Sequence, residues 1–443
     1  MNRMERVDTY EQRQAAMQRL LRGVTFGLIL LMPFSVFFAF GPPADRNILS
    51  LYAHRGFYLS DLPLAMLLVL SLIADVPWRR GPLLVTGALA IICVLAFVSI
   101  PQSVSPPFTF YIAVRWLLAF YVYVWFVQPV APASQVAAVF AAGMGIHALV
   151  GVAQVIIQGP VGLPGELALV PQADDASILA ISGVRWLRAY GLAFHPNVLG
   201  GFLAVALLLL IPWLERLPAV GLWWLLWSGL LLTFSRAAWL AVALALPVAL
   251  IAYFVKRRQA GTSLAIAAGG ALIVFAAAIF LMPEQFTTRL SPLLSLFPGS
   301  GAPVPVAEPE AFSISERVEL TDVGWEIIGQ RPWRGVGAGN FPLAMPRLRP
   351  LMRAQSVHNI PLLLASEVGL LGGALWLMMG FVVIARLILH WRKASPWLLS
   401  AICAWGAVAF IAFFDSYLWS LNSGLLLTAM VLGLASRGVR DSV

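Results

Sequence analysis

Charged side chains are scarce in this 443-residue chain: Asp, Glu, Lys and Arg make up 11% of it, whereas hydrophobic residues make up 60%. The mean hydropathy is +0.86. A soluble globular domain carries about 25% charged residues, so the composition excludes an ordinary soluble protein of this length. We therefore expect an all-α integral membrane protein that forms a single polytopic domain over residues 1–443, surrounded by membrane lipids and not by nucleic acid.

Cysteine is also scarce, and metal-ligating patterns are missing from the sequence. Cys93 and Cys403 both fall inside apolar runs, which favours two small core residues over a disulfide. No His/Cys cluster has the spacing of a metal site, and Asp174 and Asp175 are adjacent instead of forming a DxD-type motif. We expect no metal and no cofactor. No clear signal-peptide cleavage site follows the first apolar run, so we expect that run to remain as a helix.

About twelve apolar runs are long enough to cross a bilayer. They cover residues 23–40, 61–78, 82–100, 108–128, 133–158, 194–214, 218–234, 237–255, 263–282, 359–389, 396–414 and 417–435. The tenth run is long enough to tilt or to protrude from the membrane. Between the ninth and tenth runs lies the longest segment too polar for lipid, residues 283–357, which we call the large outer segment.

The basic residues are unevenly divided between the two sides that these runs define. If the N-terminus is cytoplasmic, that side receives sixteen of the 29 basic residues, including both lysines. Short basic loops stay inside, so we expect both termini in the cytoplasm and the large outer segment on the other side. The outer side receives twelve arginines and no lysine. A guanidinium group binds phosphate oxygens in pairs and stays protonated, which suits diphosphate recognition.

The large outer segment is predicted to be partly helical. Ser313 and Glu316 have the spacing of a capping box, which predicts a helix beginning there. The glycine-rich stretch 335–340 should end this helix. The basic, amphipathic stretch 341–353 is then predicted to lie flat on the membrane surface.

His358 stands where a polar turn, residues 356–360, enters the tenth apolar run. It should therefore lie at the membrane–water boundary, beneath the large outer segment. Six arginines precede it there: Arg317, Arg331, Arg334, Arg347, Arg349 and Arg353. A group that titrates near neutral pH, in a cationic environment at a membrane surface, favours chemistry on an anionic lipid-linked substrate.

Four local motifs fall on the same predicted face. They are Arg188–Gly191 with His195–Asn197, Thr233–Arg236, Arg317 with Trp325 and residues 332–341, and His358–Asn359 with Glu367–Gly369. In their order and common sidedness the motifs resemble the O-antigen ligase family, within the larger group of O-antigen ligases, O-antigen polymerases and related oligosaccharide transferases. The resemblance covers the span count, the place of the large outer segment, and residues 185–370 in motif detail.

The resemblance implies a glycosyltransferase of the bacterial inner membrane whose active site is periplasmic. Its donor would be a glycan linked to undecaprenyl diphosphate, and its acceptor a sugar hydroxyl of lipid A–core. His358 would be the general base for that hydroxyl. The diphosphate or the substrate would be bound, without a metal, by Arg188, Arg236, Arg317, Asn359 and Arg185. A donor with an activated leaving group needs no ATP.

Other interpretations of the same residues stay open. An interfacial histidine such as His358 often only caps a helix. Arg236 could snorkel at a helix end, and Arg185 could take the place of Arg188.

Two further outer residues also have simpler explanations. Arg317 could pair with Glu316 or Glu319 on the surface of the large outer segment. His195 is interpreted as a helix-start residue, because it precedes Pro196 and Asn197.

Glu367 is a carboxylate that the apolar run places inside the bilayer. Nine helical residues separate it from His358, about 13 Å along the axis and half a turn around it, so the two side chains should not touch. A buried carboxylate must be paired, protonated or functional. We favour a structural role, a buried polar contact that holds neighbouring helices. Arg115, within the fourth run, is either its partner or a second diphosphate contact, and the sequence does not choose between them.

Three functions fit these observations. The first is O-antigen ligase. The second is a transferase with the same donor, either an O-antigen polymerase or a protein O-oligosaccharyltransferase. The third, a transporter of an anionic solute, is disfavoured because we find no internal repeat and because the polar residues gather on one face.

Overall fold

The computed structural model describes residues 3–44, 54–173, 176–181, 183–257, 261–294 and 308–438, and Asp174 and Asp175 lie outside this range. Six of the described helices are long and apolar enough to cross a membrane. They are α5 (Pro106–Val127), α6 (Ala133–Ile157), α7 (Pro196–Leu210) continued by η1 (Ile211–Trp213), α9 (Arg236–Lys256), α10 (Gly261–Leu281) and α15 (Leu370–His390). The chain is thus a mostly helical membrane protein.

Shorter apolar helices fill most of the remaining predicted runs. They are α3 (Asp61–Ile73), α4 (Leu83–Val98), α8 (Leu217–Leu232), α16 (Pro396–Ile411) and α18 (Asn422–Ala435), with a four-residue α17 (Tyr417–Ser420) before the last. A longer helix, α1 (Arg3–Leu31), begins the described chain. A helix therefore overlaps each of the twelve predicted runs, whereas the number of crossings itself stays a prediction.

Two predicted runs have different boundaries in the structure. The run predicted over 23–40 is helical only to Leu31, and its last residues form β1 (Phe37–Phe40), which pairs antiparallel with β2 (Arg55–Tyr58). The tenth run is broken at Gly369 into α14 (Ile360–Val368) and α15. Gly369 has a φ of 93°, and a Cβ there would lie 2.4 Å from the carbonyl oxygen of Trp333. Only glycine fits this close approach.

The large outer segment contains three helices, α11 (Pro283–Leu294), α12 (Glu308–Gln330) and α13 (Phe341–Leu348). Because α12 begins at Glu308, Ser313 lies inside the helix, and its predicted place at a helix start was wrong. The predicted break at 335–340 is confirmed, since the three glycines there have positive φ. The apolar face of α13 packs against α12 and α14, with Phe341 and Met345 buried. Its predicted place on the membrane surface was therefore wrong, because protein covers the face that lipid would have covered.

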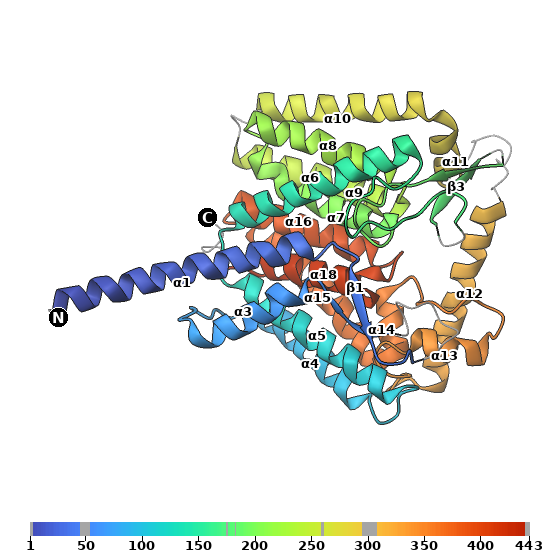
Figure 1. Cartoon of the computed structure of the whole chain (residues 1–443), viewed down its shortest axis with the longest axis horizontal. Coiled ribbons are helices and arrows are strands. Elements are labelled where there is room, and N and C mark those ends of the chain that lie inside the picture. The colour runs from blue at the N-terminus through green and yellow to red at the C-terminus, as the bar shows by residue number, and fades with distance from the viewer. Residues whose placement is uncertain are drawn as a thin grey trace.

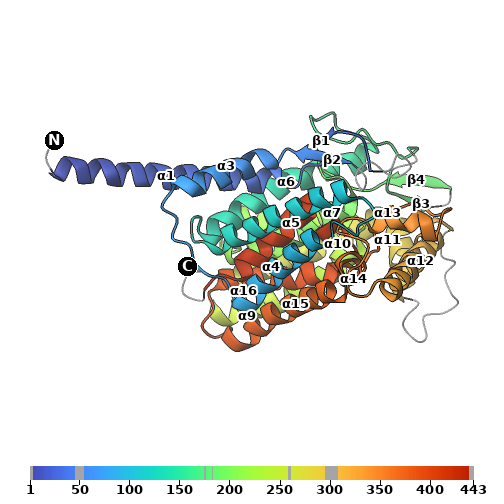
Figure 2. The same cartoon turned by 90° about the horizontal axis from the view of Figure 1, so that it is seen from below.

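The most deeply buried helices lie at the centre of the molecule. Helix α7 packs between α6, α8, α9 and α16, and 83% of the most apolar stretch formed by α7 and η1 is buried. For α10, only 6% of the corresponding stretch is buried. Figures 1 and 2 show α10 along one edge in the first view and the helices α11, α12 and α13 gathered at one end of the molecule. The second hairpin, β3 (Ile178–Ile181) with β4 (Val184–Leu187), lies at the same end.

The start of α1 and the end of α18 lie away from that end. Figures 1 and 2 place the start of α1 on the far side from α12. Arg437, just beyond α18, donates hydrogen bonds to the carbonyl oxygens of Phe126, Gln128 and Ala131, where α5 ends and α6 is about to begin. Which of the two ends faces the cytoplasm stays a prediction.

Candidate active site

A histidine–carboxylate pair lies at the end of the molecule that carries the large outer segment. His358 precedes α14, and its Nδ1 lies 3.3 Å from Oδ1 of Asp415, in the turn between α16 and α17. The backbone N–H of Ile360 donates to the carbonyl of Ala412 at 2.8 Å, which holds the two segments together. The side chain of His358 is 23% exposed and that of Asp415 is 8% exposed. The histidine thus faces outward from a buried carboxylate.

The surroundings of Asp415 keep it ionised. Burial raises its pKa, but the hydrogen bond with His358 and the positive charge of Arg317 lower it, so that the pKa lies below its ordinary value. An ionised carboxylate can only accept hydrogen bonds. The Nδ1 atom of His358 must therefore carry the proton that it shares with Asp415, which leaves the Nε2 lone pair of a neutral His358 available as a base.

A chain of hydrogen bonds connects this pair to Arg188. The Nδ2 of Asn197 donates to Oδ2 of Asp415 at 2.8 Å, and the Oδ1 of Asn197 accepts from Nη2 of Arg188 at 2.7 Å. Asn197 lies in the first turn of α7, and its backbone N–H donates to Nδ1 of His195 at 3.1 Å. His195 is therefore the residue that caps α7, as predicted. Asn197 uses both ends of its amide, which fixes Asp415 relative to the loop that carries Arg188.

Arg188 is buried, and its guanidinium is held by protein atoms. Its Nε donates to the carbonyl of Thr233 at 2.7 Å, and its Nη1 donates to Oγ of Ser177 at 2.7 Å. Burial, together with the charges of Arg289 and Arg236, lowers the pKa of Arg188 well below its ordinary value. Arg188 thus belongs to a cationic cluster. Because it is buried and bonded to Thr233 and Asn197, it positions these residues in this structure instead of facing the solvent.

The turn between α8 and α9 organises this cluster. Phe234 is buried and has a φ of 49°, in the left-handed region that a bulky residue rarely adopts. In this conformation its carbonyl accepts from Nε of Arg289 at 3.0 Å, one residue after the carbonyl that accepts from Arg188. Strained backbone of this kind concentrates at functional sites. The same turn sets the start of α9, where Arg236 is the first helical residue.

Arg236 and Arg317 line an open cavity of about 300 Å³ between the start of α9 and one face of α12. We call it the arginine cavity; its lining is completed by Ile314, Val318, Thr321 and Asp322. Nη1 of Arg317 donates to the carbonyl of Phe414 at 3.3 Å, next to Asp415. The side chain of Ser235, the N-cap residue of α9, makes no capping hydrogen bond, and the partial positive charge of this helix end adds to the two guanidinium groups. The arginine cavity is therefore suited to an anion, beside the His358–Asp415 pair.

Two of the other predicted site residues have structural contacts. Asn359 caps α14, because its Oδ1 accepts from the backbone N–H of Leu362 at 2.9 Å. Arg185, in β4, donates to the carbonyls of Pro171 and Ala173 at 2.5 and 3.0 Å, and so fastens a loop. The structure does not bring Arg185 into the network of Arg188.

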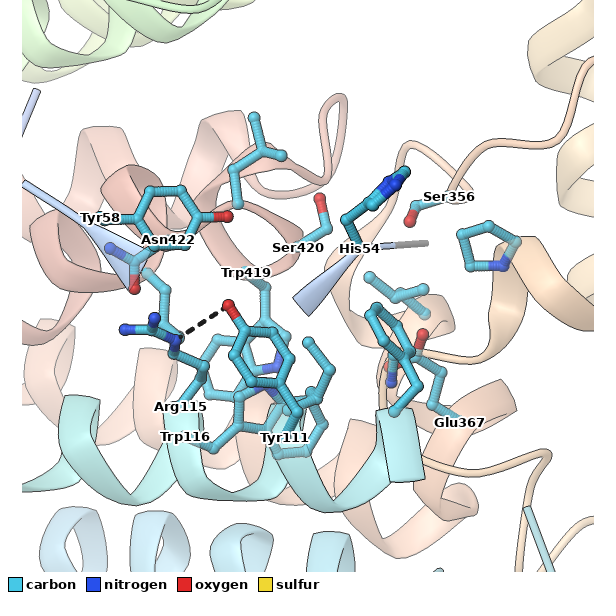
Figure 3. Close-up of a pocket in the computed structure, with 17 residues that line it drawn as sticks. His54, Tyr58, Tyr111, Arg115, Trp116, Ser356, Glu367, Trp419, Ser420 and Asn422 are labelled. Atoms are coloured by element: carbon cyan, nitrogen blue, oxygen red, sulfur yellow. Dashed lines mark hydrogen bonds between the residues drawn. The ribbon is translucent and has the colours of Figure 1, made fainter. Parts of the chain in front are cut away.

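Glu367 and Arg115 do not pair with each other. The carboxylate of Glu367 accepts from the backbone N–H groups of Gly339 at 2.9 Å and Phe341 at 3.2 Å, and thereby holds the start of α13 against α14. Arg115 instead forms an ion pair with Asp61, at 2.5 and 2.7 Å. Figure 3 shows Arg115 and Glu367 on opposite sides of one cavity. The contacts of Glu367 are those of the structural role that the sequence favoured.

Sequence reasoning missed Asp415 and gave Asn197 and Arg289 no role. A signal for Asp415 was present, since it is the only acidic residue between Pro396 and Ala435 and falls between two apolar runs on the predicted outer side. Within the described parts of the chain, no group of three or more His, Cys, Asp or Glu side chains could hold a metal ion.

The fold and the site define a helical membrane protein whose histidine–carboxylate pair and arginine cluster share one end of the molecule. Residues 221–377, from α8 into α15, match the family described as O-antigen ligase. This match, together with the membrane-span helices, supports an O-antigen ligase family membrane protein. The matched region contains Arg236, Arg317 and His358, whereas Arg188 and Asp415 lie outside it. No curated protein matches the chain.

Proposed function

We propose that this protein transfers an O-antigen glycan from undecaprenyl diphosphate to a sugar hydroxyl of lipid A–core at the periplasmic face of the inner membrane. The family match over residues 221–377 supports an activity of the O-antigen ligase or polymerase type in general. The observation that carries the finer proposal is the His358–Asp415 pair beside the arginine cavity. It provides a base and, next to it, a site for an anion.

The base acts on the acceptor. Nε2 of His358 takes the proton of the acceptor hydroxyl while that oxygen forms a bond to the anomeric carbon of the donor. The bond from the anomeric carbon to the phosphate oxygen breaks at the same time, and the diphosphate leaves with the electron pair. Asp415 stabilises the imidazolium that forms. A single displacement of this kind inverts the configuration, so an α-linked donor gives a β-linked product.

The arginines act on the leaving group. Arg236 and Arg317 reach the arginine cavity, where two planar guanidinium groups can bind diphosphate oxygens in pairs. Arg188 and Arg289 lie behind them and hold the turn at Thr233 and Phe234. Charge developing on the departing diphosphate is therefore met by groups that are already in place. The proposed reaction needs neither a metal nor ATP.

A reconstitution experiment tests the proposal and separates it from its nearest alternative. Purified protein in lipid nanodiscs receives a labelled polyprenyl-diphosphate glycan in EDTA, with either lipid A–core or a second donor molecule. Label on lipid A–core, joined with inverted configuration by NMR, is the expected result. Longer glycans on the donor lipid alone would show an O-antigen polymerase, and label on a protein hydroxyl would show an oligosaccharyltransferase. Retained configuration, or a sugar trapped on the enzyme, would contradict the single displacement.

A further inference from the structure

A second roomy cavity lies on another side of the molecule from the arginine cavity. It has a volume of about 460 Å³ and opens to the surface between α3, α5 and the β1–β2 hairpin. Most of its lining is apolar and includes Phe40, Phe57, Leu64, Leu68, Phe110 and Leu118. We call it the α3–α5 groove. Figure 1 shows α3 and α5 towards one edge of the molecule and α9 and α11 towards the other.

The charges of the α3–α5 groove are arranged at the end where α3 begins. Asp61 and Arg115 neutralise each other through their paired hydrogen bonds, and Arg115 also donates to the carbonyl of Gly56 at 2.6 Å. The third charged residue of the lining is Arg55, in β2. No carboxylate of the described residues pairs with Arg55. The lining therefore has a net charge of +1, from two arginines and one aspartate, and complements an anion.

The groove shares a wall with a narrower cavity that is lined in part by residues close in sequence to the candidate active site. Tyr111 and Arg115 line both of them. Ser356 and Ser420, which line the narrower cavity with Arg115 (Figure 3), lie close in sequence to His358 and Asp415 respectively. A molecule anchored in the groove would thus lie beside a cavity whose wall includes the segments that carry the base and its carboxylate, and none of the residues of the arginine cavity.

We propose that the α3–α5 groove binds the acceptor, a phosphorylated glycolipid, with an acyl chain along its apolar wall and a phosphate on Arg55. This inference rests on the proposed function, because it gives the second substrate a place of its own. Apolar area removed from water or from competing lipid contact fixes the chain, while the guanidinium selects the anionic headgroup. Donor and acceptor then approach His358 from different sides, so two bulky lipids need not share one entrance.

Binding of lipid A to the purified protein, measured by native mass spectrometry without donor, tests the inference. Ala65 lies on the exposed wall of the groove, and Ala65→Trp should fill it; Leu72→Trp places the same ring on an exposed part of α3 outside the groove. We expect Ala65→Trp and Arg55→Gln each to weaken lipid A binding by about tenfold or more, since a charge-assisted contact or the chain site is lost. Leu72→Trp and Arg80→Gln, an arginine outside the groove, should bind as the unmodified protein does.

The same variants, probed with a polyprenyl phosphate, distinguish the two lipid substrates. Polyprenyl phosphate binding should survive Ala65→Trp. Equal loss of both lipids, or lipid A binding that Ala65→Trp leaves intact in a protein with an unchanged melting temperature, would overturn the inference. Because binding is measured without transfer, these results are independent of the proposed function. If lipid A bound in the groove but no glycan were transferred to it, the proposed function would be contradicted, and lipid A would not be the acceptor.

Discussion

Nδ1 of His358 lies 3.3 Å from the carboxylate of Asp415, although 57 residues separate them in the chain. The contact joins the start of α14 to the turn after α16. Asp415 is in turn fixed by Asn197 from the start of α7. Three helices therefore determine where the imidazole points. A base that is oriented in this way has its tautomer set before substrate arrives.

Asp415→Asn should slow transfer without preventing it. The neutral amide no longer stabilises the imidazolium, so we expect a loss smaller than the roughly 10²–10⁴-fold that follows removal of a general base. Steady-state kinetics at a fixed pH measure the loss. Asp75→Asn, at an exposed aspartate, is the control, and an unchanged kcat in Asp415→Asn would show that the contact has no catalytic role.

Arg236→Lys should lose most activity. An ammonium group keeps the charge but cannot bind two phosphate oxygens in a plane, so the donor KM should rise and kcat should fall. Arg349→Lys is a matched control, because Arg349 is held by Glu326 at 3.1 Å on the large outer segment. Kinetics with a fixed acceptor concentration provide the measurement. Full activity in Arg236→Lys would reduce the arginine cavity to a general basic surface.

The sequence predicted the class of protein and part of the site, for physical reasons that differ. Long apolar runs must be helical in lipid, which makes the helices predictable, and motif order placed Arg236 and His358 on one face. Asp415 stands out in the sequence as a lone acidic residue, but its partner does not, because the contact with His358 forms only where the start of α14 meets the turn after α16. Arg188 was predicted to be a phosphate ligand, but no sequence signal reveals that buried partners hold its donors. The break at Gly369 depends likewise on the distant carbonyl of Trp333.

His195→Asn should make the protein less sensitive to mild acid. His195 precedes α7, and burial, followed by the charge of Arg188, lowers its pKa to about 3. The unfolded chain takes up a proton below about pH 6.5, and the folded protein does not, so stability present above that pH is lost as the pH falls. At pH 5 this amounts to about 2 kcal/mol. Asparagine can also cap the helix, and it has no group that takes up a proton in this pH range.

Melting temperatures at pH 7 and pH 5 check the role of His195. The decrease should be smaller in His195→Asn than in the unmodified protein. Asp415 does not affect this comparison. Because its pKa is lowered in the folded protein, its contribution to stability changes only at a pH well below 5. Equal decreases in the two proteins would mean that His195 is not kept neutral by the fold.

Cysteine labelling checks the predicted orientation. Leu351 is fully exposed in the large outer segment, and Lys393 is exposed between α15 and α16. Both native cysteines are buried, so background labelling should be low. An impermeant maleimide on intact spheroplasts should label Leu351→Cys and should not label Lys393→Cys until the cells are opened. The reverse pattern would place the candidate active site in the cytoplasm and remove the proposed donor from its reach.

The transfer rate of His358→Gln, measured together with donor affinity, tests the central claim most directly. Glutamine is polar but cannot accept the acceptor proton, so transfer should fall by roughly 10²–10⁴-fold. Donor affinity should stay unchanged, because Arg236 and Arg317 form the anion site. Transfer at the normal rate by a folded His358→Gln protein would contradict the assignment of His358 as the base.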